Sequence, residues 1–261
     1  MDMGELEKQI LARVNQSMPS SKTEYQCSKC LDSGWLDFYD EDGNRFAKKC
    51  ECRLAREAEE RLQASGLAEA VAVQTFEAFR TDTPIREHTK RVAQQYIVDL
   101  FDGEDPQRRP WLYVGGNPGS GKTHICTAVC GEILKHNIGV RYMQWLEESK
   151  KLKYANSDES FTDAVNDYIN PSVLYIDDLF KQKYTARPVF TEADIKIAFM
   201  ILNGRYLQNK PTIISSEWDL VDHLLDADEG IFSRVYERCK YHMISIPRDL
   251  ENNYRLAGEH Q

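Results

Sequence analysis

Short apolar runs, rich in branched and aromatic residues, recur along the last two thirds of the chain and predict buried β-strands. They cover residues 111–114, 139–143, 172–178, 211–216 and 241–246. Helical patterns with an apolar stripe separate these runs, over residues 124–136, 144–168 with a break near 156–158, 191–207 and 220–239. Strands that alternate with helices form a parallel sheet covered on both faces, so the pattern predicts an α/β sandwich.

The chain divides into two predicted domains. The first covers residues 1–66, and residues 67–80 are expected to connect it to a second domain over residues 81–261. Near the start of the second domain, Thr83 is a good N-cap and Pro84 suits the first position of a helix. The strands of the α/β sandwich all belong to this second domain.

The first domain has its own elements. The pattern of residues 1–18 predicts a short amphipathic helix, which either packs on its own domain or binds a partner protein. Residues 34–47 predict a β-hairpin with its turn over residues 40–44. Residues 53–65, rich in Ala, Glu, Arg and Leu, predict a helix that stops at Gly66.

The composition is that of an ordinary soluble protein. With 261 residues, 41% of them hydrophobic, the chain buries a proper core. No run approaches the roughly 18 apolar residues of a membrane span, and the start MDMGELEKQI lacks the layout of a signal peptide, so we expect a cytoplasmic protein without a membrane partner. A net charge of −9 argues against coating nucleic acid by bulk charge and favours partners bound through protein contacts.

One motif carries most of the predicted chemistry. Residues 116–123 match the phosphate-loop pattern G-x-x-x-x-G-K-[ST] between a predicted strand and a predicted helix. Backbone amides of such a loop surround the phosphates of ATP, a lysine reaches the β and γ oxygens, and a threonine hydroxyl ligates Mg²⁺. The predicted ATP-binding residues are Gly116, Asn117, Pro118, Gly119, Ser120, Gly121, Lys122 and Thr123.

Two acids end the predicted strand over residues 172–178. A phosphate loop needs an acid near its metal, and Asp177 is placed to hold Mg²⁺ together with Thr123. Asp178 is then the predicted general base that polarises the attacking water. Hydrolysis of the γ-phosphoryl group follows as the predicted reaction, because it needs positioning and charge stabilisation.

The chain has seven cysteines, and in a cytoplasmic protein their spacing indicates metal binding rather than disulfides. Three of them, Cys126, Cys130 and Cys239, lie in apolar helical patterns and are expected to be buried hydrophobes. The other four form two close pairs that the hairpin brings together, the layout of a structural tetrahedral zinc site. The predicted Zn²⁺ ligands are Cys27, Cys30, Cys50 and Cys52, with a redox or merely reduced state as the alternative.

These motifs, in this order and spacing, resemble the AAA+ ATPases of the bacterial replicative helicase-loader group (DnaC and DnaI type), with the transposition helper IstB as a cousin. The resemblance rests on GNPGSGKTH, LYIDDLF, TIISSEWDL, IFSRVYERC and NNYRLAG, and on a cysteine module similar to the N-terminal zinc domain of DnaI-like and phage loaders. It covers nearly the whole chain. It implies the AAA+ strand order, with the phosphate-loop strand beside the sensor strand, and no C-terminal lid domain after Ile246.

The resemblance also implies further site residues. A polar sensor at the γ-phosphate falls at Ser216 or Glu217, and we favour Ser216 because a carboxylate repels a phosphate. Arg234 matches an arginine finger that acts on the ATP of a neighbouring subunit. The alternative is an ion pair of Arg234 or Arg238 with Glu237 or Glu229 on a solvated helix face. Arg255 matches a terminal Tyr-Arg whose role is sensor-like or structural.

The resemblance predicts an ATP-dependent loader of the replicative helicase, from a bacterium or a phage. The zinc domain docks on the hexameric helicase (DnaB/DnaC type), and the AAA+ domain assembles, hydrolyses ATP weakly until assembled, and contacts single-stranded DNA. The candidate DNA contacts are Lys181, Lys183, Tyr184 and Arg187, with Lys150, Lys151 and Lys153 as a second group. Two alternatives stay open: an IstB-like transposition helper, and a non-hydrolysing adaptor gated by nucleotide.

Overall fold

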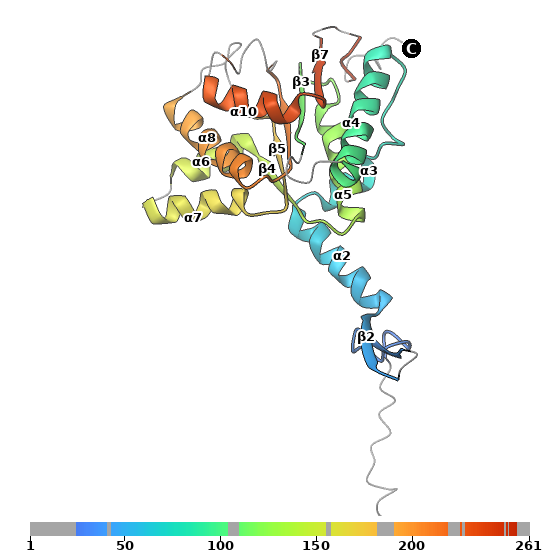
Figure 1. Ribbon diagram of the computed structural model, residues 1–261. Coiled ribbons are helices and arrows are strands. Elements are labelled where there is room, and N and C mark those ends of the chain that lie inside the picture. The colour runs from blue at the N-terminus through green and yellow to red at the C-terminus, as the bar shows by residue number, and fades with distance from the viewer. Residues whose placement is uncertain are drawn as a thin grey trace, which may run out of the picture. The chain divides into compact units, whose positions relative to one another are not determined.

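The computed structural model describes residues 25–40, 43–103, 110–154, 158–181, 191–218, 225, 228–247, 249 and 251–254 (Figure 1). The predicted helix over residues 1–18 lies outside this part of the chain, as do Lys183, Tyr184, Arg187 and Arg255. The chain forms two compact units, which divide after Glu57. Within the described ranges, no helix is both long and apolar enough to cross a membrane.

The first unit is built on an antiparallel hairpin of β1 (Trp35–Tyr39) and β2 (Arg45–Lys49). Its turn is closed by two bonds to Asp40, whose carbonyl accepts from the N–H of Gly43 and whose carboxylate accepts from the N–H of Asn44. Gly43 has a φ of +81°, which glycine adopts without strain. The predicted hairpin is confirmed, and helix α2 (Glu51–Ser65) follows it.

The second unit contains a sheet of five parallel strands in the order β4-β5-β6-β3-β7. The strands are β3 (Leu112–Gly116), β4 (Val140–Gln144), β5 (Val173–Asp177), β6 (Thr212–Ser216) and β7 (Met243–Ile246). β3 precedes the phosphate loop and pairs with β6. This confirms the prediction that the phosphate-loop strand lies beside the sensor strand.

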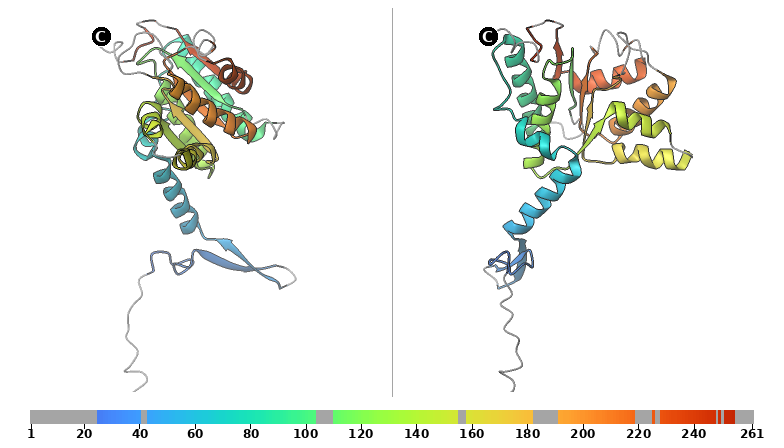
Figure 2. Two further views of the ribbon diagram at one scale, coloured as in Figure 1. Left: turned by 90° about the vertical axis from the view of Figure 1, so that its left-hand side faces the viewer. Right: turned by 180° about the vertical axis from the view of Figure 1, so that it is seen from behind.

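Helices cover both faces of this sheet (Figure 2). On one side lie α3 (Ala68–Val73), α4 (Pro84–Asp102) and α5 (Lys122–Lys135); on the other lie α6 (Trp145–Lys153), α7 (Asp158–Ile169), α8 (Glu192–Leu207) and α10 (Glu229–Cys239). Successive strand residues alternate between two cores: Leu112 and Val114 join one, whereas Trp111 and Tyr113 join the other. The predicted α/β sandwich is confirmed.

Local sequence signals fix several helix starts. The hydroxyl of Thr83 accepts from the N–H of Arg86, with Pro84 at the first position of α4 as predicted. Thr191 caps α8 and Asp228 caps α10 in the same way. The predicted break near residues 156–158 separates α6 from α7.

The segment 67–80, which we expected as a connection, contains helix α3 and two buried phenylalanines. Phe76 and Phe79 are 6% and 3% exposed and belong to the same core as α5. A Cβ on Gly131 of α5 would lie 3.7 Å from Val71 of α3, so the two helices approach closely. These apolar residues pack on the core of the second unit. The boundaries of the two domains stay a prediction.

Candidate nucleotide site and cysteine cluster

The phosphate-loop residues join the end of β3 to the start of α5, as the motif predicts. Gly119 and Gly121 have φ values of +80° and +89°, and Gly121 is the N-cap of α5. A Cβ on Gly121 would lie 2.8 Å from Cε2 of Tyr254, so the loop needs glycine both for its backbone and for the approach of residues near the C-terminus. The first residues of α5 line a cavity, and the start of a helix is a favourable place for an anion.

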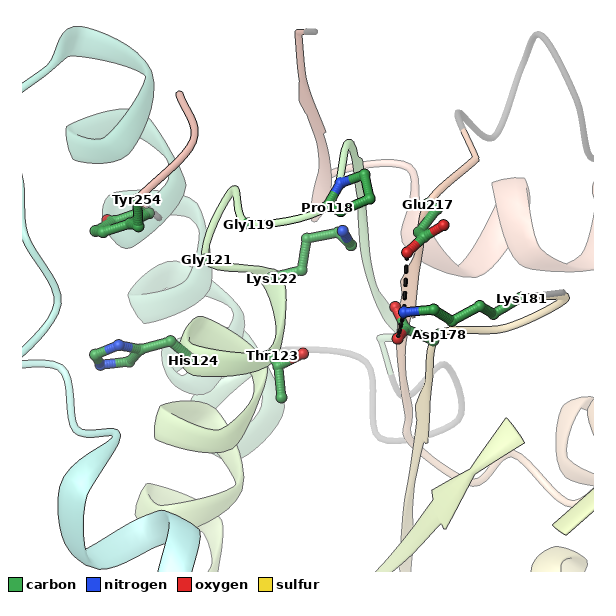
Figure 3. A pocket seen from close by; sticks show the side chains of 10 residues that line it. All are labelled: Pro118, Gly119, Gly121, Lys122, Thr123, His124, Asp178, Lys181, Glu217 and Tyr254. Carbon is green, nitrogen blue, oxygen red and sulfur yellow. Dashed lines mark hydrogen bonds and ion pairs between the residues drawn. The ribbon is translucent and has the colours of Figure 1, made fainter. Parts of the chain in front are cut away.

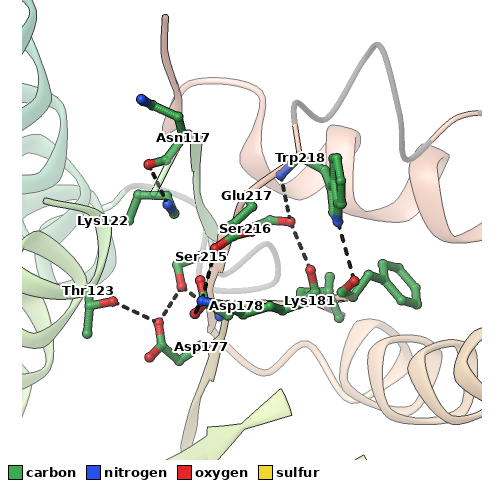
Figure 4. Close-up of polar contacts among 12 residues, drawn as sticks. Asn117, Lys122, Thr123, Asp177, Asp178, Lys181, Ser215, Ser216, Glu217 and Trp218 are labelled. Atoms are coloured by element: carbon green, nitrogen blue, oxygen red, sulfur yellow. Dashed lines mark hydrogen bonds and ion pairs between the residues drawn. The ribbon is translucent and has the colours of Figure 1, made fainter. Parts of the chain in front are cut away.

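Lys122 is held inside its own loop. Its ammonium donates to the carbonyl oxygens of Gly116 at 2.8 Å and of Asn117 at 3.0 Å, and the residue is 5% exposed. Burial lowers the pKa of Lys122, while the nearby carboxylates of Asp178 and Glu217 act in the opposite direction. Figure 4 shows the lysine beside Asn117, opposite Asp177 and Asp178.

Asp177 ends β5 at the centre of a group of hydroxyls. Its carboxylate accepts from Tyr175 and Ser215, both at 2.6 Å, from Tyr142 at 3.0 Å and from Thr123 at 3.2 Å. Burial, and then the charge of Asp177, raises the pKa of the Tyr142 phenol, which therefore stays protonated and donates. The predicted partners Thr123 and Asp177 are brought together.

Asp178 starts a tight turn that faces the same cavity. Its φ is +56°, and its N–H donates to the hydroxyl of Ser215 at 2.9 Å. Its carboxylate lies 2.7 Å from the ammonium of Lys181, which also lies 2.9 Å from Glu217. Burial, followed by repulsion from Asp177, raises the pKa of Asp178, and Lys181 opposes this rise.

A cavity of about 270 Å³ joins the phosphate loop to these acids. It is lined by Pro118, Gly119, Gly121, Lys122, Thr123, His124, Asp178, Lys181, Glu217 and Tyr254. Figure 3 shows two rings, His124 and Tyr254, on one side of the loop and the charged residues on the other. Phe79 packs against both rings, with centroids 5.3 Å from His124 and 5.9 Å from Tyr254.

Ser216 does not line the cavity, and its assignment as the sensor over Glu217 stays a prediction. The Ser216 hydroxyl donates to the carbonyl of Leu179 at 2.9 Å and accepts from the N–H of Trp218 (Figure 4). Successive strand residues point to opposite faces, so Ser215 turns toward Asp177 and Ser216 turns away. Glu217, the next residue, lines the cavity instead.

Arg234 lies on α10 and is held against α8. Its side chain donates to the side-chain oxygen of Asn203 at 2.8 Å and to the carbonyl of Gly230 at 2.7 Å, and it lies over the ring of Phe199. Glu237, the partner considered in the ion-pair alternative, accepts from the phenol of Tyr206 at 2.7 Å. Arg234 does not line the cavity of its own subunit, so a role at ATP requires a second copy of the chain.

The described lysines among the candidate DNA contacts all have acidic partners. Lys181 lines the cavity and pairs with Asp178 and Glu217. Lys150 and Lys151 pair with Glu147 and Glu148 on their own helix, and Lys153 pairs with Asp194 at 2.6 Å.

Several residues of the site escape sequence reasoning. Tyr142 and Tyr175 are direct neighbours in the register of β4 and β5. A correct pairing of these two strands would therefore have placed both phenols beside Asp177. His124 follows the phosphate loop directly, but its contact with the carbonyl of Thr75 at 2.9 Å depends on the folding of residues 67–80. Tyr254 reaches the loop from the far end of the chain, and no local pattern indicates that contact.

The four predicted zinc ligands form a cluster in the first unit. Their sulfur atoms all lie within 4.8 Å of one another, with Cys27 3.7 Å from Cys50 and Cys30 3.3 Å from Cys52. Zinc–sulfur bonds of about 2.3 Å in a tetrahedron place the sulfurs roughly 3.8 Å apart, so the donor set fits zinc. The N–H of Gly34 donates to the Cys30 sulfur, as amides do around thiolate sites.

The thiol of Cys27 has a lowered pKa. Backbone amides of Cys30 and Lys29 donate to the Cys27 sulfur and lower its pKa to about 7. The three cysteines of the second unit differ, because Cys126, Cys130 and Cys239 are fully buried in the core, as expected. Burial raises the pKa of each of these three thiols.

Comparisons with known proteins agree with the fold and the loop. The family model described as IstB-like ATP binding protein matches residues 35–259. Phage-like element PBSX protein XkdC of Bacillus subtilis is 30% identical over 244 residues, which are 92% of this chain and 89% of XkdC. Replicative helicase loader DnaC of Escherichia coli is 28% identical over 107 residues, 40% of this chain and 42% of DnaC.

Among solved structures, the crystal structure of DnaI has the same fold. It superposes with a TM-score of 0.50 at 20% identity, covering 74% of this chain and 95% of that chain. The parallel sheet, the phosphate loop and the extent of the family match lead to one conclusion: the chain belongs to the IstB-like ATP binding protein family, the AAA+ phosphate-loop ATPases that include the DnaC type.

Proposed function

We propose that this protein is an ATP-dependent loader of a replicative helicase onto single-stranded DNA. The observation that carries the proposal is the pairing, in one chain, of a four-thiol cluster with a phosphate-loop cavity whose acids are in place. The similarity to DnaC, named as a replicative helicase loader, supports it. A protein that docks on one partner and switches with ATP needs both of these parts.

ATP fits the cavity with its phosphates at the loop. Lys122 leaves the carbonyls of Gly116 and Asn117 for the phosphate oxygens, and the amides at the start of α5 surround them. The adenine lies at the end formed by His124 and Tyr254, where aromatic faces suit a base. Arg255, the next residue in the sequence after Tyr254, is proposed to have a sensor-like or a structural role.

Thr123 and Asp177 are the residues that would hold Mg²⁺, because their oxygens already converge. The ion supplies charge neutralisation for the phosphates when it is bound. Tyr142, Tyr175 and Ser215 keep the Asp177 carboxylate turned toward Thr123. Asp178 accepts the proton of the attacking water at its carboxylate.

Hydrolysis is completed by a neighbouring copy. Arg234 is proposed to reach the ATP of the next subunit, where a guanidinium stabilises the charge that develops on the transferred phosphoryl group. Hydrolysis is therefore weak in the isolated chain and rises on assembly. The DNA contact is proposed for Lys183, Tyr184 and Arg187, in the segment after Asp178.

The cysteine cluster is proposed to bind zinc and to fold the docking module. Cys27, Cys30, Cys50 and Cys52 supply four thiolates, which leave no position for a catalytic water, so the zinc is structural. The hairpin presents Trp35, Phe38 and Tyr39 with 43%, 40% and 68% of their surface exposed. Exposed aromatic residues on a small module suit a protein partner such as the helicase.

Size exclusion with light scattering tests the proposal. The full chain is mixed with the replicative helicase of its host in ATP and in ADP, with and without zinc chelation. A complex that Cys27→Ser or chelation abolishes, while the ATPase unit stays folded, supports the proposal. If no complex forms in ATP and none forms in ADP, the proposal is wrong.

Two other functions have specific support. The family description names IstB, so a transposition helper is the second candidate, and binding to a transposase in place of the helicase would favour it. Glu217 in the cavity favours a nucleotide-gated adaptor that does not hydrolyse ATP. Turnover by the purified protein with its partner decides against that adaptor.

A further inference from the structure

Lys181 joins two carboxylates at the charged end of the cavity. Its ammonium lies 2.7 Å from Asp178 and 2.9 Å from Glu217, and all three residues line the cavity. Their side chains are 35%, 21% and 19% exposed, so water screens the interaction only in part. Figure 3 shows the bridge facing the ammonium of Lys122.

The local backbone sets this position. Asp178 and Phe180 both have positive φ values, +56° and +61°, and the N–H of Lys181 donates to the carbonyl of Asp178 at 2.9 Å. The chain thus turns back on itself directly after β5. Non-glycine residues with positive φ carry strain, which is retained where surrounding structure requires the conformation. Here the turn brings the lysine to the cavity.

The charges at this end need a cation. Asp178 and Glu217 face the space beyond the phosphate loop, with Asp177 close behind. A triphosphate brings several more negative charges to the same space, and two uncompensated carboxylates there would repel its terminal group. Lys122 and the proposed Mg²⁺ serve the loop end, and Lys181 is the cation in contact with Glu217.

We propose that Lys181 is a second phosphate-contacting cation, which neutralises Glu217 and binds the terminal phosphoryl group of ATP. The Lys181–Glu217 pair then distinguishes ATP from ADP, a task that a single neutral side chain at Ser216 cannot perform from its buried position. The inference rests on the proposed binding of ATP in this cavity and is independent of helicase loading.

Nucleotide affinity tests the inference. We expect Lys181→Met to weaken binding of a non-hydrolysable ATP analogue about tenfold or more, the loss of one charge-assisted contact, and to change ADP binding little. Lys181→Arg retains most of the affinity because it retains the charge. Adding Glu217→Gln to Lys181→Met restores much of the loss, since the repelling carboxylate is gone.

Lys135→Met is the matched control, because Lys135 forms an ion pair with Glu132 at the same three-residue spacing but lies at the far end of α5. It leaves both affinities unchanged. Equal losses for the analogue and ADP, or faster hydrolysis by Lys181→Met, overturn the inference. If the unsubstituted chain binds neither nucleotide, the ATP proposal and this inference both fail; if it binds both and Lys181→Met does not discriminate, only the inference fails.

Discussion

The backbone N–H of Tyr254 donates a hydrogen bond to the carbonyl oxygen of Gly119 at 2.8 Å. The tip of the phosphate loop is thus tied to a segment 135 residues later in the chain. The ring of Tyr254 also lies beside Gly121, and its phenol donates to the carbonyl of Arg80 at 3.1 Å. The loop and Tyr254 form one wall of the cavity, and Phe79 packs behind it against the rings of His124 and Tyr254.

The first prediction concerns the fit of this wall. Gly121→Ala places a Cβ 2.8 Å from the Tyr254 ring at a φ of +89°, so both the contact and the backbone become strained. We expect the free energy of unfolding to fall by about 1 to 3 kcal/mol and nucleotide affinity to fall with it. Urea unfolding and a nucleotide titration measure the two effects.

Gly139→Ala is the control for this substitution. A Cβ on Gly139 meets no atom within 4 Å, and Gly139 does not have a positive φ. Its stability and nucleotide affinity should match those of the unsubstituted chain. A Gly121→Ala protein that also matches it would show that the loop and the Tyr254 ring move apart without cost.

The phosphate-loop site is largely predictable from sequence, because its parts are local. The loop, Thr123 and Asp177 follow from one motif and one apolar strand that ends in acids. The orientation of Ser216 is not predictable in this way, because it depends on a strand alternation whose phase the sequence alone does not fix. The structure fixes that phase through the register of β5 and β6, in which Tyr175 pairs with Ile213.

The remaining residues of the site depend on tertiary packing. Phe79 belongs to a segment that composition alone suggests is a connection, yet it is 3% exposed beside His124 and Tyr254. Glu217 is unfavourable beside a phosphate when considered by itself. The ion pair with Lys181 compensates the charge of Glu217. The sequence does not reveal this pair, because it depends on a turn in which Asp178 and Phe180 have positive φ values.

The second prediction concerns pH. Hydrogen bonds from Arg86, and then from Arg80, lower the pKa of Asp82 to about 2, below the ordinary value of 3.8. A lowered pKa means that the folded state favours the charged carboxylate, so its contribution to stability is present above about pH 4 and is lost as the pH falls toward 2.

Asp82→Asn should therefore lower the free energy of unfolding at pH 7 by about 1 kcal/mol, a value reduced for solvent screening because Asp82 is 42% exposed. The difference from the unsubstituted chain shrinks as the pH drops from 4 toward 2. Urea unfolding across this range measures it. Glu147→Gln is the control: it breaks an exposed pair with Lys150 and should change stability little at any pH. If the loss of stability in Asp82→Asn does not depend on pH, the lowered pKa of Asp82 is not its cause.

The third prediction concerns removal of the metal. The strands of the hairpin are mostly exposed, so the first unit has little core to hold it together without zinc. We expect about one zinc per chain. Chelation should remove hydrogen-exchange protection from the hairpin amides and leave that of the central sheet unchanged.

Cys30→Ser should give the same result without a chelator, whereas Cys239→Ala, a change at a buried thiol of α10, should retain the zinc. Metal analysis measures the zinc content of the two variants, and hydrogen exchange measures the protection of their hairpin amides. Protection of the hairpin that survives both chelation and Cys30→Ser would show that the cluster is not a structural metal site.

The fourth prediction concerns Arg234, and it separates action on a neighbour from a structural role. Arg234→Ala should lower the hydrolysis rate of the assembled protein about a thousandfold or more, the effect of losing an arginine finger. Asp178→Asn should be inactive for a different reason, since it loses the general base. Because the two residues serve one site from different subunits, a mixture of the two inactive proteins contains interfaces with an intact Arg234 and an intact Asp178. The mixture should therefore recover hydrolysis that neither variant shows alone, measured as phosphate release at equal total protein.

Arg238→Ala provides the comparison for packing. Arg238 lies one turn later on α10 and donates to the side chain of Asn209 and to the carbonyl of Tyr206, contacts much like those of Arg234 with Asn203 and Gly230. If both arginines only hold α10 against α8, the two alanine variants should lose similar amounts of stability, and mixing with Asp178→Asn should restore nothing. If Arg234 acts in trans, Arg238→Ala should keep its activity after assembly, and only the mixture containing Arg234→Ala should show rescue.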